Sequence, residues 1–136
     1  MFIKDVMQTR LITLFQESTI REAARLMKEE DVGCVLITDG QRLKGLITDR
    51  DIACWLAEGK DPDKVNVGYV MQKNIITAAP ETDIYEASKL MASRKIRRLP
   101  IVEDNKLCGL VTTSDIADVL EEEIDNFFHV EAAYHH

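Results

Sequence analysis

The chain repeats its own sequence at an interval of 64 residues. Without a gap, residues 4–57 align with residues 68–121, and 20 of the aligned positions are identical. The best-matched stretches are Val6-Met7-Gln8 with Val70-Met71-Gln72, and Gly45–Ala53 with Gly109–Ala117. A repeat of this length is one structural unit, and such units bury their apolar faces against a neighbour. The sequence therefore predicts two copies of one fold, related by a pseudo-twofold axis.

Size and charge limit what two such copies can do. At 136 residues with 46% hydrophobic residues, the chain can bury one substantial core, but no catalytic domain fits beside the repeats. The formal net charge of -7 argues against nonspecific nucleic-acid binding, which depends on Lys and Arg. No apolar run is long enough for a signal peptide or for the ~20 residues of a membrane span. We therefore expect a cytoplasmic protein that is not an enzyme and that binds neither membranes nor nucleic acids.

Each copy shows the same order of predicted elements, β-α-β-β-α. A side-chain acceptor followed three residues later by Glu predicts a capping box, and this pattern occurs at Thr19–Glu22 and at Asp83–Glu86. The apolar residues behind each box follow the spacing of one buried helical face. The predicted faces are Ile20, Ala23, Ala24 and Met27 in the first copy, and Ile84, Ala87, Ser88 and Met91 in the second.

Strand signals complete each copy. Apolar, largely β-branched runs around a turn predict hairpins, with strands at 34–38 and 43–48 and at 99–102 and 107–112. Short leading strands are expected at Ile12-Thr13 and Ile76-Thr77, and second helices from about 49 to 58 and from about 114 into the tail. The chain is thus divided into a first repeat at 1–58, a turn-rich linker at 59–67, a second repeat at 68–120 and a C-terminal extension at 121–136.

A Gly-x-x-Thr-x-x-Asp pattern marks the junction between the last strand and the second helix. Its members are Gly45, Thr48 and Asp51, and again Gly109, Thr112 and Asp115. Glycine weakens a strand interior, so its repetition indicates close approach by another backbone or by a ligand. The threonine falls at the start of the helix, where its hydroxyl can act as a cap and the helix dipole favours an anion. The aspartate follows on the same face, and its two acceptor oxygens suit a vicinal diol.

These residues allow two interpretations. Phosphate donors beside a diol acceptor fit a ribonucleotide, because both groups occur together in such a ligand. The simpler interpretation is that the threonines only cap the helices and the aspartates only complement the helix dipole.

The ordered set of motifs resembles a known family. The repeat order, the Val-Met openings, the hairpins and the Gly-Leu-Ile-Thr-Asp-Arg-Asp-Ile and Gly-Leu-Val-Thr-Thr-Ser-Asp-Ile junctions are similar to tandem cystathionine-β-synthase (CBS) domains, also called a Bateman module. The resemblance extends from about Val6 to Leu120. It implies an α+β fold of two β-α-β-β-α repeats whose sheets pack face to face. In many relatives, two symmetric clefts between the repeats hold AMP, ADP, ATP or another adenosyl ligand.

The resemblance also implies which residues bind the ligand. Phosphate and ribose would be held by Thr48, Asp51, Thr112 and Asp115. The adenine would lie near Ile12, Thr13, Ile76, Thr77, Pro80 and Ile101.

Charge distinguishes the two copies. A basic residue just before the Leu-Pro step often reaches the phosphates in relatives, which implies such a role for Arg98 and also for Arg97. The first copy has the uncharged Gly33 and Cys34 at these positions, and Arg50 would substitute only in part. We therefore expect unequal sites, with the more anionic ligand in the second copy. The alternative for the arginines is a solvated surface with ordinary ion pairs.

Other residue types indicate no second chemistry. Cys34, Cys54 and Cys108 contain no CxxC pair and are expected to be reduced core thiols. All three histidines, His129, His135 and His136, lie in the tail, and whether the last two are native or belong to a tag stays open. No Cys/His set has metal-ligand spacing, and no nucleophile lies beside a base. We therefore expect no metal site, no catalytic residue and no catalytic cofactor.

Two functions are compatible with these observations. We expect a regulatory module that binds an adenine nucleotide, AMP, ADP or ATP, and signals its occupancy to a protein partner. The alternative is a structural interaction module with vestigial clefts. The sequence leaves open the preferred ligand, the number of occupied clefts, the partner and the direction of regulation. A homodimer is also expected, through an isologous contact of Ile52, Trp55, Leu56, Ile116, Val119 and Leu120.

The tail after Leu120 has no counterpart in the first copy. The spacing of Ile116, Val119, Leu120, Ile124 and Phe127 predicts two further helical turns with one apolar stripe and an acidic face. This stripe either packs on its own module or dimer mate, or it docks the regulated partner.

Overall fold

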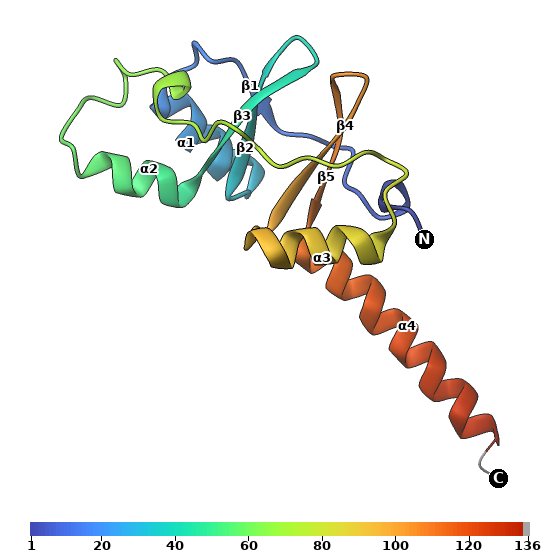
Figure 1. The fold of residues 1–136 in the computed structure, drawn as a ribbon. Coiled ribbons are helices and arrows are strands. Elements are labelled where there is room, and N and C mark those ends of the chain that lie inside the picture. The colour runs from blue at the N-terminus through green and yellow to red at the C-terminus, as the bar shows by residue number, and fades with distance from the viewer. Residues whose placement is uncertain (135–136) are drawn as a thin grey trace. The chain divides into compact units, whose positions relative to one another are not determined.

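The structure is a computed structural model that describes residues 1–134, so His135 and His136 lie outside the described part. The first repeat contains β1 (Thr13–Leu14), α1 (Ile20–Glu30), β2 (Cys34–Asp39), β3 (Arg42–Thr48) and α2 (Asp49–Leu56). The second contains α3 (Ile84–Arg94), β4 (Arg98–Glu103), β5 (Lys106–Thr112) and α4 (Thr113–Tyr134) (Figure 1). Short 3-10 helices at Ile3–Asp5 and Val67–Tyr69 precede the repeats. The predicted α+β class with two repeats is confirmed.

The chain forms two compact units, and each unit takes its leading segment from the other repeat. Unit 1 contains residues 1–9, 77–101 and the chain from 108 onward, whereas unit 2 contains residues 10–76 and 102–107. A backbone bridge joins Gln8 to Leu110 in unit 1, and a matching bridge joins Gln72 to Leu46 in unit 2. Each Val-Met-Gln segment therefore pairs with the last strand of the other repeat.

Side-chain caps begin the first helix of each repeat. Thr19 Oγ1 accepts from Glu22 N at 3.1 Å, and Glu22 Oε2 accepts from Thr19 N at 3.0 Å, which confirms this capping box. Asp83 caps α3 by accepting from the backbone N–H of Glu86 at 3.3 Å. The Glu86 side chain does not return to Asp83 and instead pairs with Lys89 at 3.8 Å. The predicted capping box at Asp83 is therefore wrong in one respect, because Asp83 caps the helix but the Glu86 side chain does not accept from the Asp83 backbone in return.

Only the first repeat has a leading strand. In that repeat β1 runs parallel to β2, and the N–H of Leu36 donates to the carbonyl of Ile12 at 3.0 Å. The equivalent position in the second repeat is Pro100, which has no N–H to donate. Ala78 makes only an isolated bridge to β4. The predicted strand at Ile76-Thr77 is therefore wrong, and the missing donor of Pro100 accounts for the difference.

The core of unit 2 is formed by α1, α2, β2, β3 and the segment that follows the linker. Its members are Ile20, Ala23, Met27, Val35, Ile37, Ile47, Ile52, Trp55, Val67 and Met71. Ala24, which was expected on the buried face of α1, is exposed. The corresponding face of α3 buries Ala87 and Met91.

Half of the predicted dimer contact is already buried within the chain. Ile52 and Trp55 are each 7% exposed and Ile116 is 5% exposed, so the expectation that they meet a second copy is wrong. Leu56 and Leu120 remain about half exposed on their helices.

The tail continues α4 as a helix to Tyr134, which confirms the predicted extension and makes it longer than two turns. Figure 1 shows α4 running far past α3, the helix that it contacts within unit 1. Its apolar side chains are exposed, among them Ile124 at 54% and Phe127 at 61%. The part of the stripe from Leu120 onward therefore does not pack on its own module. Coverage by a second copy or by a partner stays a prediction.

Candidate functional site

The end of β3 and the start of α2 are locked together by a reciprocal pair of hydrogen bonds. Thr48 has extended backbone angles and is the N-cap of α2. Its Oγ1 accepts from Asp51 N at 3.1 Å, while Asp51 Oδ2 accepts from Thr48 N at 2.9 Å. The threonine and the aspartate of the motif thus form a capping box, with Asp in place of the more common Glu.

Unit 1 repeats this geometry at the start of α4. Thr112 Oγ1 accepts from Asp115 N at 3.2 Å, and Asp115 Oδ2 accepts from Thr112 N at 2.9 Å. Both threonines therefore cap a helix, as predicted, and both aspartates are held at fixed positions beside a helix N-terminus. Because the box uses one carboxylate oxygen, the other oxygen of each aspartate can accept from a ligand.

The glycine of each motif makes room for the exchanged segment. A Cβ at Gly45 would lie 2.5 Å from the carbonyl oxygen of Gln72 and 2.8 Å from Met71 Sδ. A Cβ at Gly109 would lie 2.3 Å from Met7 Sδ. The prediction that these glycines allow close approach of another backbone is confirmed in unit 2, where the neighbour is a main-chain oxygen.

Each aspartate also accepts a hydrogen bond from a glutamine of the exchanged segment. Gln72 Nε2 lies 2.9 Å from Asp51 Oδ2. Gln8 Nε2 lies 3.1 Å from Oδ2 and 3.3 Å from Oδ1 of Asp115. Sequence reasoning missed both glutamines as site residues. The signal was present, because Gln follows Val-Met at the same position of both repeats.

The arginines of the second repeat lie beside the capping box of unit 1. The backbone N–H of Thr113, the first residue of α4, donates to the carbonyl of Arg97 at 3.0 Å. Arg98 follows as the first residue of β4 and is partly buried. In unit 2 the equivalent bond runs from Asp49 N to the carbonyl of Gly33, also at 3.0 Å. The same backbone position therefore carries cationic side chains only in unit 1.

The residues predicted to surround the adenine differ in accessibility. Thr13 and Thr77 are exposed, and Ile12 and Ile76 are partly buried. Pro80 and Ile101 are buried, and Ile101 is 0% exposed. Arg50 lies exposed in the first turn of α2, where its N–H donates to Asp49 Oδ1 at 2.8 Å.

Sequence comparison identifies the family. The model of the CBS domain matches residues 3–58 and 67–122, which together make up most of the chain. The chain belongs to the CBS domain family. It is 42% identical over 116 residues to the CBS domain-containing protein YhcV of Bacillus subtilis, which covers 85% of this chain and 82% of YhcV. It is 34% identical over 121 residues to Hypoxic response protein 1 of Mycobacterium tuberculosis, covering 88% of this chain and 85% of that protein.

A solved structure agrees with this assignment. The CBS domain pair of protein MJ0100, in complex with 5'-methylthioadenosine and S-adenosyl-L-methionine, is similar with a TM-score of 0.80 and 28% sequence identity. The similarity covers 90% of this chain and 98% of that one. CBS pairs are regulatory, ligand-binding modules, and the resemblance drawn from the duplicated motifs is confirmed.

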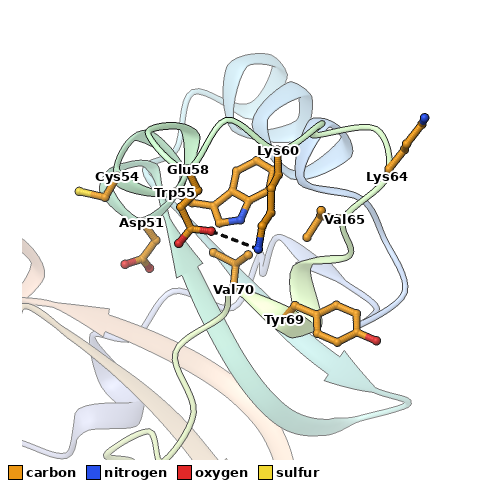
Figure 2. A pocket seen from close by; sticks show the side chains of 9 residues that line it. All are labelled: Asp51, Cys54, Trp55, Glu58, Lys60, Lys64, Val65, Tyr69 and Val70. Atoms are coloured by element: carbon orange, nitrogen blue, oxygen red, sulfur yellow. Dashed lines mark ion pairs between the residues drawn. The ribbon is translucent and has the colours of Figure 1, made fainter.

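A pocket of about 570 Å³ lies next to the junction of unit 2 (Figure 2). Its wall includes Asp51 and Trp55 of α2 and Tyr69, which follows the linker in the sequence. Lys60 pairs with Glu58 at 3.6 Å, whereas the Lys64 side chain points outward. The pocket was not predicted, because its wall comes from a linker whose path the sequence does not specify.

The described residues show neither a metal site nor a membrane-spanning helix. Within residues 1–134, no group of three or more His, Cys, Asp or Glu side chains is arranged to hold a metal ion. None of the helices described is long and apolar enough to cross a membrane. Cys34 is buried and Cys108 is partly buried, but Cys54 is exposed on α2. The expectation of core thiols is therefore wrong for Cys54.

Proposed function

We propose that this CBS pair senses an adenine nucleotide of the AMP, ADP or ATP class and passes the state of its sites to a protein partner. The observation that carries this proposal is the duplicated capping box, Thr48 with Asp51 and Thr112 with Asp115, at a strand-to-helix junction. Each box presents a carboxylate oxygen beside a helix N-terminus. The bound adenosyl compounds of the similar CBS pair MJ0100 support an adenosyl ligand.

The chemistry of each part fits one portion of such a ligand. A carboxylate oxygen accepts from a ribose hydroxyl, and the N-terminus of a helix favours the negative charge of a phosphate. The threonine and aspartate are already ordered by the capping box, so binding loses little side-chain entropy.

We further propose that the site of unit 1 takes the more anionic ligand. Arg97 and Arg98 lie next to its capping box, and a guanidinium suits phosphate because it donates in a fixed fork. The equivalent residues of unit 2, Gly33 and Cys34, carry no positive charge.

A thermal-shift panel tests the proposal directly. AMP, ADP, ATP, NAD and S-adenosylmethionine are added separately, because a ligand at 100 times its dissociation constant stabilises the protein by about 2.7 kcal/mol. We expect a rise in melting temperature with at least one adenine nucleotide. No shift with any compound at millimolar concentration would favour the alternative, an interaction module with vestigial sites.

Calorimetry of two matched variants tests the inequality of the sites. Asp115→Ala is expected to weaken binding of the preferred nucleotide more than Asp51→Ala, because only unit 1 adds the arginines. A hydrogen bond to a charged group contributes about 1.5–3 kcal/mol, so either loss is measurable. Asp118→Ala, which removes an exposed charge from the same helix as Asp115, serves as the control. Equal losses in the two variants would remove the claim of unequal sites.

A further inference from the structure

The exchanged glutamines occupy acceptors that a bound diol would need. In unit 1, Asp115 Oδ2 accepts from both Thr112 N and Gln8 Nε2, and Oδ1 accepts from Gln8 Nε2. A carboxylate oxygen has two lone pairs, so Oδ2 is fully used. A vicinal diol that binds through both oxygens of Asp115 must therefore displace Gln8.

Unit 2 contains the same arrangement in a looser form. Asp51 Oδ2 accepts from Thr48 N and from Gln72 Nε2. Among the described residues, no donor lies within hydrogen-bonding distance of Asp51 Oδ1. One ribose hydroxyl can therefore bind Oδ1 while Gln72 stays in place.

The glutamines belong to segments that are attached to the site strand by backbone hydrogen bonds. Gln8 exchanges two such bonds with Leu110, at 2.8 and 3.0 Å. Gln72 exchanges two with Leu46, at 2.7 and 3.1 Å. Loss of the hydrogen bond between the glutamine and the aspartate therefore removes one attachment of a segment that comes from the other repeat. The occupancy of a site can in this way affect residues outside that site.

We propose that Gln8 and Gln72 are internal competitors of the ligand, and that release of Gln8 from Asp115 is the first step by which a bound ribose is signalled to residues 1–9. This proposal rests on the proposed adenosyl site. The strength of the competition differs between the units, since Gln8 contacts both carboxylate oxygens and Gln72 contacts one.

Calorimetry with AMP and 5'-methylthioadenosine tests the competition. Both probes carry the ribose diol, but only AMP carries a phosphate. Gln8→Ala is expected to bind both probes at least about tenfold more tightly than the unaltered protein, the lower end of the range for one hydrogen bond to a charged group. Gln72→Ala is expected to have a smaller effect. Gln41→Ala, at an exposed turn outside the site, is the control and should change neither affinity.

A ligand without the diol separates competition from an indirect effect. Because 2'-deoxy-AMP cannot use both oxygens of Asp115, the gain from Gln8→Ala should fall to less than twofold with this probe. Equal or weaker binding of AMP by Gln8→Ala would overturn the proposal, because it would make Gln8 neutral or a positioning residue. If no probe binds either the unaltered protein or the variant, the proposed function itself fails.

A spectroscopic measurement follows the glutamine itself. The side-chain amide signal of Gln8, assigned by its loss in Gln8→Ala, is expected to move toward that of a solvent-exposed amide as AMP saturates the protein. An unchanged signal in the presence of bound AMP would show that the bond to Asp115 persists, and it would overturn the proposal independently of the affinities.

Discussion

Replacing the two motif glycines by alanine should have unequal effects on stability, although the glycines occupy equivalent positions. In Gly45→Ala the new methyl group would lie 2.5 Å from the carbonyl oxygen of Gln72, which is part of the backbone. In Gly109→Ala it would lie 2.3 Å from Met7 Sδ and 2.8 Å from Met7 Cγ, which belong to a flexible side chain. A methionine can change rotamer, whereas a paired backbone segment must move as a whole.

The contacts give the approximate size of each effect. Overpacking costs about 1–3 kcal/mol. In Gly45→Ala the shift of Gln72 also weakens its two backbone hydrogen bonds to Leu46, each worth about 0.5–1.5 kcal/mol. Alanine offsets part of this loss, by about 0.4–1 kcal/mol, because it restricts the unfolded chain. We expect losses of about 3 kcal/mol for Gly45→Ala and about 1 kcal/mol for Gly109→Ala.

Urea unfolding measured by two signals would show these losses. The single tryptophan, Trp55, belongs to the core of unit 2, so its fluorescence reports the unit that contains Gly45. Far-UV circular dichroism reports the helices of both units. Gly45→Ala should lower the urea midpoint of the fluorescence transition more than Gly109→Ala does.

Double-mutant cycles identify the atoms responsible. In a Met7→Ala background, Gly109→Ala should cost much less, because the two closest atoms, Met7 Sδ and Cγ, have been removed and only the Cβ at 3.2 Å stays. In a Met71→Ala background, Gly45→Ala should remain costly, because the carbonyl of Gln72 is still in place. Relief of Gly45→Ala by Met71→Ala would refute the argument that the backbone contact dominates.

Two further predictions concern the ends of helices. Asp31 and Lys95 end α1 and α3 in the left-handed region, at φ of 54° and 55°. Glycine adopts this region without strain, so Asp31→Gly and Lys95→Gly should each raise the free energy of unfolding in urea by up to about 1 kcal/mol. A lower free energy of unfolding in both variants would contradict this prediction. Removal of the chain after Leu120 takes away exposed side chains such as Phe127, so the melting temperature should not fall, and a clear fall would show that the tail packs on its own module or on a second copy. Light scattering at micromolar concentration compares the masses of the full chain and the truncated chain, and it then shows whether a second copy covered the tail.

Repetition in the sequence predicted most of the fold, because each element was supported twice. The hairpins, the first capping box and the helical tail all follow from local patterns. The structure differs from the prediction at positions where one residue alters the local pattern while the repeat as a whole is kept. Pro100 removes one donor and with it a strand, and Glu86 pairs with Lys89 and does not return to Asp83.

The capping residues of the candidate site were predictable from the sequence, but the glutamines that contact them were not. Thr48 and Asp51 were singled out from spacing alone, since a strand-to-helix junction requires a cap. Their bond to Gln72 depends on a segment that follows the linker and pairs with the strand of the preceding repeat. Local patterns do not contain that pairing, because a segment of three residues has no periodicity by which its partner strand could be recognised.

The exchange of leading segments predicts which fragment of the chain folds alone. The fragment 1–58 contains the first repeat as the sequence divides it, but it lacks Val67 and Met71, which are 0% and 8% exposed in the core of unit 2. Burying a side chain of this size contributes about 1.5–3 kcal/mol, so their loss together removes a large part of the stability of a small domain.

The fragment 10–76 has a similar length and contains every member of that core, together with the hydrogen bonds between Gln72 and Leu46. It should therefore show a cooperative urea transition in Trp55 fluorescence, whereas the fragment 1–58 should show a weak or absent transition. A cooperative transition of equal midpoint in both fragments would mean that the segment behind the linker adds nothing to the stability of unit 2. The hydrogen bond from Gln72 to Asp51 would then belong to a segment that is not held firmly in unit 2.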